Sequence, residues 1–184
     1  MDNSYFTSIL KQFSYNKSLG DKTFEQLSKE QLFWSYNDES NSIATIVKHI
    51  SGNMRSRWTN FLTEDGEKPW RDRDNEFINS FSSKEEMIAC WEEGWSCLFE
   101  NLTKITPETQ DTIVYIRNEG HTIPEAINRQ LSHYSYHIGQ IVTIGKMIKN
   151  TNWETLSIAK NQSKSYNLEK FAQNKAKKHF TDEI

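Results

Sequence analysis

Hydrophobic residues recur every three or four positions through four stretches of the chain, which is the spacing of one face of an α-helix. The first stretch covers residues 4–28 and weakens at Gly20, and the second covers residues 42–61. The third begins at Ser82 or Ser83 and runs to about residue 103, and the fourth covers residues 124–149. We therefore predict four amphipathic helices whose apolar faces share a core.

Helix-start signals stand at the beginning of three of these stretches. Asn41-Ser42 is a capping signal before the second helix, and Ser83 with Glu86 matches the S-x-x-E capping box before the third. Pro124 suits the first turn of the fourth helix, where a missing N–H does no harm. These signals support the predicted starts.

The connection over residues 62–81 has no sustained period, is charged, and contains Gly66 and Pro69. Twenty extended residues reach about 66 Å, whereas a helix of that length spans about 30 Å. The segment can therefore cross the whole length of the molecule, which would make helices two and three parallel. We predict an all-α, up-down-down-up four-helix bundle with a long crossover, and a small hairpin over residues 112–123 around Asn118-Glu119-Gly120 before the fourth helix.

Composition favours a folded, water-soluble protein. Among 184 residues, 12% are aromatic, with three Pro and seven Gly, and the mean hydropathy is -0.79. Disordered chains are poor in aromatics, and a turn-rich all-β protein needs more Pro and Gly. No run approaches the roughly 20 apolar residues of a membrane span, and the N-terminus does not resemble a signal peptide. We expect a cytoplasmic protein that does not associate with membranes.

Charge divides the chain into two parts. The formal net charge is -3. Residues 151–184 carry six lysines and four acidic residues, a net +2, which leaves -5 for residues 1–149. We predict a bundle domain over residues 1–150 and a C-terminal surface extension over residues 151–184. An acidic bundle argues against nucleic acid as a partner.

The two cysteines, Cys90 and Cys97, lie seven residues apart on the third predicted helix. That spacing places them about 10 Å apart along the helix axis, whereas a disulfide requires Cα atoms within about 7 Å. We expect two free, buried thiols.

Three of the five histidines lie where a metal ion could be bound. His133 and His137 are four residues apart on the fourth helix, so their rings project from one face and can chelate one ion. His49 lies between Ile46 and Ile50, at the edge of the apolar stripe of the second helix. Three imidazoles with an open position match a catalytic metal site.

The alternative is that the spacing arises by chance and that these core-edge histidines are satisfied by hydrogen bonds. His121, beside Gly120, and His179, in the basic tail, read as a loop and a surface residue. Gln140 and Asn53 follow the histidines by three and four residues. They can either orient a water or substrate or be ordinary polar residues of a helix face.

Arginines are concentrated in residues 55–73, at Arg55, Arg57, Arg71 and Arg73. Arginine suits bidentate capture of a carboxylate or phosphate. Acidic residues alternate with them, so pairing within the segment is the other interpretation; these residues are Asp65, Asp72, Asp74 and Glu76. The sequence leaves both interpretations open.

The sequence HISGN on the second helix and HYSYHIGQI on the fourth resemble the DinB-like (YfiT-like) metal-binding bundle superfamily. Over residues 5–167 the chain is similar to an uncharacterised bacterial subfamily of it. The resemblance implies an up-down-down-up bundle, a divalent ion such as zinc or nickel on His49, His133 and His137, and a homodimer. Some members of the superfamily are transferases or isomerases that use low-molecular-weight thiols.

Three functions follow from these observations. The first is a metal-dependent enzyme, a thiol S-transferase or hydrolase acting on a small molecule. The second is a non-catalytic metal-binding or stress-response module of the same fold, although a structural zinc normally has four protein ligands and only three are predicted here. The third, a factor that acts on damaged nucleic acid, is disfavoured by the acidic bundle.

Overall fold

The computed structural model describes residues 4–182 except residues 107 and 110. Most of these residues are helical, so the predicted helical class is confirmed. The α-helices are α1 Ser4–Glu25, α2 Lys29–Phe33, α3 Ile43–Trp58, α4 Lys84–Leu102, α5 Ile123–Lys149 and α6 Ser163–Phe171. Two 3-10 helices, η1 Asp74–Phe77 and η2 Asn150–Asn152, and two strands, β1 Ile113–Ile116 and β2 Glu119–Thr122, complete the described elements.

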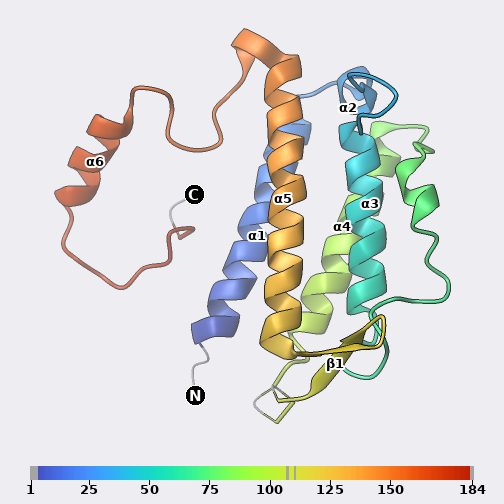
Figure 1. The fold of residues 1–184 in the computed structure, drawn as a ribbon. Helices are drawn as coiled ribbons and strands as arrows, with labels where there is room; N and C mark the ends of the chain where they lie inside the picture. Colours follow the sequence, from blue (N-terminus) through green and yellow to red (C-terminus); the bar gives the residue numbers. More distant parts are fainter. Residues whose placement is uncertain (1–3, 107, 110, 183–184) are drawn as a thin grey trace.

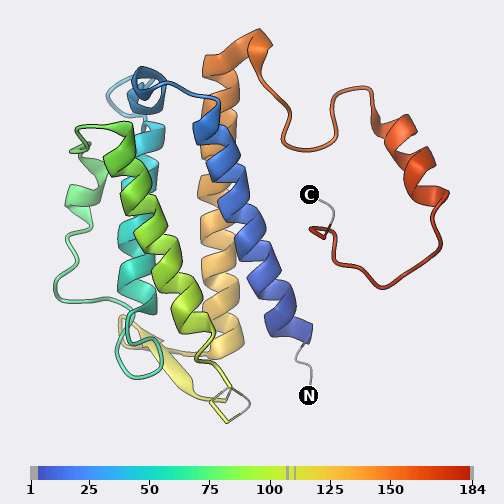
Figure 2. The same ribbon diagram turned by 180° about the vertical axis from the view of Figure 1, so that it is seen from behind.

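The four long helices α1, α3, α4 and α5 lie side by side (Figures 1 and 2). Their apolar faces meet in a core rich in aromatic rings. Its largest buried side chains are Trp58, Trp91, Trp95, Tyr134 and Phe13. Phe13 contacts Trp58, Trp95 and Tyr134, with ring centroids 6.0–6.4 Å apart. Rings from all four helices therefore interlock at one level of the core, an arrangement that tolerates little displacement of any helix.

The capping signals read from the sequence are used at the helix starts. Ser42 accepts a hydrogen bond from the Thr45 N–H at the start of α3, and Ser83 accepts one from the Glu86 N–H at the start of α4. Glu86 bonds back to the Ser82 N–H, one residue before the cap that the sequence predicted. A reciprocal capping box between Thr122 and Glu125 starts α5.

The first predicted helix, residues 4–28, is corrected by the structure. α1 ends at Glu25, and a second short helix, α2, begins after the cap residue Ser28, between the first two predicted helices. Gly20 does not interrupt α1. A Cβ at this position would overlap the Trp91 ring. The absence of a side chain there lets the indole of α4 pack directly on the backbone of α1.

The predicted hairpin is present, with its turn one to two residues earlier than expected. β1 pairs with β2 antiparallel, and Ile116 opposes Glu119. The two turn residues, Arg117 and Asn118, both have positive φ, 56° and 61°. Such a two-residue turn matches the right-handed twist of the flanking strands.

The long crossover between α3 and α4 is held against the molecule at several points. Asp65 accepts hydrogen bonds from the backbone N–H groups of Arg117 and Asn118, each at 2.8 Å, so the crossover is tied to the hairpin turn. It then forms η1, which packs on α3. This segment, expected to have no regular structure, is therefore positioned to contribute to a site on α3.

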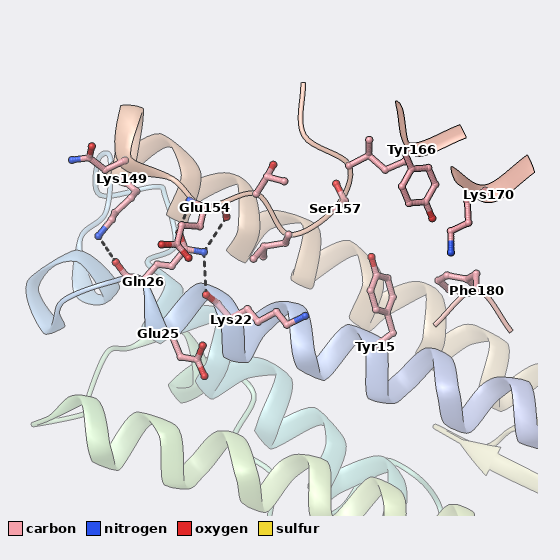
Figure 3. Close-up of a pocket in the computed structure, with 14 residues that line it drawn as sticks. Tyr15, Lys22, Glu25, Gln26, Lys149, Glu154, Ser157, Tyr166, Lys170 and Phe180 are labelled. Carbon is pink, nitrogen blue, oxygen red and sulfur yellow. Dashed lines mark hydrogen bonds between the residues drawn. The ribbon is translucent and has the colours of Figure 1, made fainter. Parts of the chain in front are cut away.

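The chain after α5 forms an extension that returns to α1 (Figures 1 and 2). Figure 3 shows Tyr166, Lys170 and Phe180 of the extension near Tyr15 of α1, around an open pocket of about 1030 Å³. The predicted division between residues 150 and 151 stays a prediction.

Among the helices of the described residues, none combines the length and apolar character needed to cross a membrane. Cys90 and Cys97 are both free and half-buried.

Candidate metal centre

The three histidines singled out in the sequence lie together. His49 comes from α3, and His133 and His137 come from α5, which packs beside α3 (Figure 1). One ring nitrogen of each lies within 4.8 Å of the others, so the group could hold a metal ion. The convergence follows from the helices, because His49 occupies the edge of the buried stripe of α3 that faces α5.

His49 is oriented by a buried carboxylate from the crossover. Glu76 in η1 lies 2.9 Å from His49 Nδ1 through its Oε2, and Arg71 donates to both oxygens of Glu76, at 2.8 and 2.9 Å. A Cβ at position 52 would overlap Glu76, so Gly52 is what lets the carboxylate reach across α3. With Nδ1–H donated to Glu76, His49 has Nε2 left as a lone-pair donor for an ion.

The charge of Glu76 is stabilised in place. Burial raises the pKa of Glu76, but the hydrogen bonds from His49 and Arg71 outweigh burial, and the pKa is lowered overall. Glu76 is therefore a carboxylate at neutral pH. A carboxylate behind an imidazole makes the opposite ring nitrogen a stronger ligand.

His137 is oriented in the same way by an amide. Its Nδ1 lies 2.8 Å from Gln140 Oε1, and Gln140 Nε2 donates to the Tyr136 hydroxyl at 3.1 Å. A carbonyl oxygen only accepts, so Nδ1 of His137 carries the proton and Nε2 is the free lone pair. Gln140, proposed from the sequence either to face the site or to be a plain surface residue, thus bonds directly to a histidine of the cluster.

His133 lies within reach of the same point in space. The Nε2 atoms of His133 and His137 are 3.1 Å apart. Two nitrogens bound to one ion at about 2.0–2.1 Å lie roughly 3.0–3.4 Å apart, so this spacing fits a shared ion. Burial, together with the nearby His137 and His49, lowers the pKa of His133 to about 3. Its imidazole is therefore neutral at physiological pH, which is the state that binds metal.

The floor of the site is a fixed hydrogen-bond chain between α3 and α5. Trp58 Nε1 donates to the Tyr134 hydroxyl at 3.2 Å, and that hydroxyl donates to Asn53 Oδ1 at 3.0 Å. Asn53 is buried and lines a small cavity beside His49 and His133. The sequence left two interpretations open for Asn53, and the structure bonds it to Tyr134 in the core.

The arginine segment is engaged with acidic residues, although mostly with different partners from those expected. Arg57 and Arg71 bond to Glu67, and Arg71 bonds to Glu76. Arg55 faces Glu93 on α4 at 3.8 Å. Arg73 lies over the Phe77 ring at 5.2 Å. Pairing therefore accounts for part of the cluster and leaves Arg73 without an ion pair among the described residues.

Sequence reasoning missed the contribution of η1. Glu76 and Phe77, whose ring stacks on His49 at 4.6 Å, come from a segment without periodicity. A carboxylate 27 residues from its histidine leaves no local spacing pattern. His121 contacts Arg129, and His179 contacts Ser8 of α1, so neither joins the cluster.

Comparison with known proteins gives a family but no activity. A family model described as "Protein of unknown function (DUF1572)" matches residues 1–162. No curated protein matches the chain, and no solved structure matches it. The matched range includes α3, η1 and α5, which together supply the histidine cluster and its carboxylate.

Proposed function

The chain belongs to the family described as "Protein of unknown function (DUF1572)", and we propose that it is a metal-dependent enzyme that uses an open three-histidine centre. The ligands are His49, His133 and His137. The carrying observation is that their ring nitrogens converge within 4.8 Å while Glu76 and Gln140 orient two of the rings. Neutral, oriented imidazoles at this spacing are what a divalent ion requires.

We propose further that the helices form an up-down-down-up four-helix bundle of the DinB-like type. Support comes from the colour order in Figure 1, where α3 and α4 both run toward the hairpin while α1 and α5 run away from that end. The crossover between α3 and α4 is long enough to return the chain to the far end of the bundle, as a parallel pair of consecutive helices requires. Zinc or nickel as the ion, a homodimer and a cytoplasmic location stay predictions.

The proposed reaction class is thiol transfer or hydrolysis on a small molecule. A divalent ion bound by three histidines lowers the pKa of a thiol or water at its remaining position and so supplies a nucleophile near neutral pH. The protein's part is to orient the rings of His49 and His137 and to keep His133 neutral. Asn53, which lines the cavity beside His49 and His133, is a polar group close enough to the cluster to orient a substrate.

Metal content of single variants tests the proposal. Protein purified without an affinity tag should contain about one divalent ion per chain, measured by elemental analysis, and His133→Ala or His137→Ala should abolish stoichiometric binding. His121→Ala and His179→Ala are the matched controls and should keep full content. Wild-type content in both His133→Ala and His137→Ala would contradict the metal centre, provided circular dichroism shows both variants folded.

A non-catalytic metal site is the second candidate. Within the described residues the ligand group has three members, and a structural zinc normally has four protein ligands. X-ray absorption spectroscopy of the metal-loaded protein separates the two. Three nitrogen ligands plus exchangeable oxygen favour the enzyme, whereas a fourth protein ligand favours a structural role.

A further inference from the structure

A small cavity adjoins the histidine cluster and is lined by positively charged side chains. Its volume is about 280 Å³, and His49, His133, Asn53 and Gln130 form part of its wall. The rest of the wall comes from five of the chain's six arginines, which are Arg57, Arg71, Arg73, Arg117 and Arg129. They come from α3, the crossover, the hairpin turn and α5, so positively charged side chains from elements far apart in sequence line the same cavity.

The acidic residues nearby do not neutralise this wall. Glu67 and Glu76 bond to Arg57, Arg71 and Arg117, and among the described residues no aspartate or glutamate lines the cavity itself. Five guanidinium groups thus face two bonded carboxylates. Like charges held this close repel one another, so an anion entering the cavity gains favourable electrostatic energy.

Two of the arginines can still form an ion pair with a ligand. In the part of the chain that the structure describes, Arg73 and Arg129 form no ion pair; Arg73 lies on Phe77 and Arg129 donates to His121. Both residues are exposed and line the cavity. A planar guanidinium that is free in this way can bind a carboxylate or phosphate through two parallel hydrogen bonds.

Two buried polar atoms of residues that line the cavity lack hydrogen-bond partners among the described residues. Arg57 is 6% exposed and Gln130 is 4% exposed, yet Arg57 Nε and Gln130 Oε1 have no hydrogen-bond partner among the described residues. Leaving a buried donor or acceptor unpaired is energetically unfavourable. An oxyanion could accept from Arg57 Nε, and a hydroxyl or protonated oxygen on the same ligand could donate to Gln130 Oε1.

We propose that this cavity binds the oxyanion group, carboxylate or phosphate, of the substrate of the metal centre. The substrate is then an anionic small molecule whose charged end lies against Arg73 and Arg129 and whose reactive end lies at His49 and His133. This inference rests on the proposed function for the reaction, while the anion site itself stands on the arginines.

Binding of simple anions to the full-length, metal-loaded protein tests the inference. Inorganic phosphate and succinate are titrated by calorimetry at constant ionic strength set with chloride, and the two arms tell a phosphate site from a carboxylate site. We expect saturable binding of at least one anion, weakened about tenfold or more by Arg73→Gln or Arg129→Gln. Arg55→Gln is the control, because Arg55 lies on α3 beside Glu93 and does not line the cavity.

The outcomes separate this inference from the metal proposal. If neither anion binds saturably, or if Arg73→Gln and Arg129→Gln both bind like the wild type, the anion site is wrong even where metal content is complete. If Arg73→Gln and Arg129→Gln lose anion binding with unchanged metal content, the inference holds. If His133→Ala and His137→Ala both keep full metal content while the arginine variants lose the anion, the metal proposal fails and the anion site stands.

Discussion

At the scale of single residues, the orientation of two of the histidines is set by the group that bonds to Nδ1. For His49 that group is a carboxylate, and for His137 it is an amide. His133 instead faces His137 on the ion-binding side, with the two Nε2 atoms 3.1 Å apart. Of the two orienting groups, only the carboxylate brings a net charge to the site. A substitution at Glu76 is therefore the best way to measure separately what this residue contributes to folding stability and to metal affinity.

Replacing Glu76 with Gln should weaken both metal binding and folding. The amide keeps an acceptor for His49 Nδ1 but leaves Arg71 with one fewer buried charge partner, and removing one partner of a buried pair costs about 3–5 kcal/mol. Loss of a supporting carboxylate typically lowers metal affinity about 10–100-fold. Urea unfolding of the metal-free protein and competition with a zinc indicator measure the two effects.

Glu93→Gln is the matched control for that substitution. Glu93 is exposed and its nearest basic atom, on Arg55, is 3.8 Å away. Exposed pairs contribute little, so the free energy of unfolding should change by less than about 1 kcal/mol and the metal affinity should not change. Equal effects of the two substitutions would show that Glu76 acts only through its charge at long range.

His133 should make the stability of the metal-free protein depend on pH. Its pKa is lowered, chiefly by burial, to about 3, so below pH 6.5 the unfolded chain takes up a proton that the folded protein refuses. The stability is thus fully present above about pH 6.5 and is lost as the pH falls toward 3. In EDTA, His133→Asn should show a shallower loss between pH 7 and pH 5 than the wild type.

The pH window for that comparison is chosen to exclude Glu76. Its pKa is also lowered, so its contribution to stability is lost only at more acidic pH, below the ordinary range of a glutamate. Denaturant unfolding at several pH values from 7 to 5 gives the slope. Identical slopes for wild type and His133→Asn would mean that His133 binds a proton equally well in the folded and unfolded states.

At the scale of elements, periodicity identified what packs against the core and little else. The four long helices bury a continuous face, so the spacing of Ile and Trp residues along them reveals both the helices and the inward edge that carries His49, His133 and His137. Arg117 and Asn118 form the turn, and both have positive φ. The alternation of polar and apolar residues along the strands does not specify which two residues make the turn. Glu76 reaches its histidine only because the crossover folds back, and a tertiary path of this kind leaves no periodic signal.

Close packing of α3 on α4 depends on a glycine. A Cβ at Gly94 would lie 2.9 Å from the backbone Cα of Ser51, whereas a Cβ at Gly139 in α5 would meet nothing within 4 Å. Gly94→Ala should therefore force the helices apart and destabilise the fold by about 1–3 kcal/mol. Gly139→Ala should stabilise it by about 0.5–1 kcal/mol, because alanine favours the helix.

Thermal and urea unfolding of these two variants give the comparison directly. The same chemical change is made in two long helices, so helix propensity contributes equally and cancels. A difference in sign follows from the contact with Ser51 alone. If Gly94→Ala were as stable as Gly139→Ala, α3 and α4 would have to be further apart than the structure places them.

At the scale of the whole molecule, the segment after α5 consists of two parts with different attachments. Trp153 is half-buried and lies beside Gly145 of α5, and Glu154 exchanges two hydrogen bonds with the Gln26 side chain, at 2.8 and 3.1 Å. Beyond residue 162 the contacts with α1 include a Lys11–Asp182 ion pair, a Ser8–His179 hydrogen bond and the Tyr15–Phe180 ring pair. Figure 3 shows Gln26 bonded to Glu154 and, further along α1, Tyr15 near Phe180 of the extension.

This difference predicts where the domain ends. Exposed ion pairs contribute about 0–1 kcal/mol, and one aromatic pair and one hydrogen bond contribute about 0.5–1.5 kcal/mol each. A chain ending at residue 162 should therefore lose about 1–4 kcal/mol. A chain ending at residue 150 also loses the packing of Trp153 and the Gln26 bonds, and should lose about 2 kcal/mol more. We therefore propose that the boundary expected at residue 150 lies instead near residue 162, where the family match also ends.

Urea unfolding followed by circular dichroism, with metal content measured on the same samples, compares the two truncated chains with the full one. Both should keep one ion per chain, because all three histidines precede residue 150 and no described residue of the extension joins their cluster. Equal stability of the two truncations would restore the boundary at residue 150. Loss of metal from the shorter chain alone would mean instead that Trp153, by holding α5 against α1, also keeps His133 and His137 facing α3.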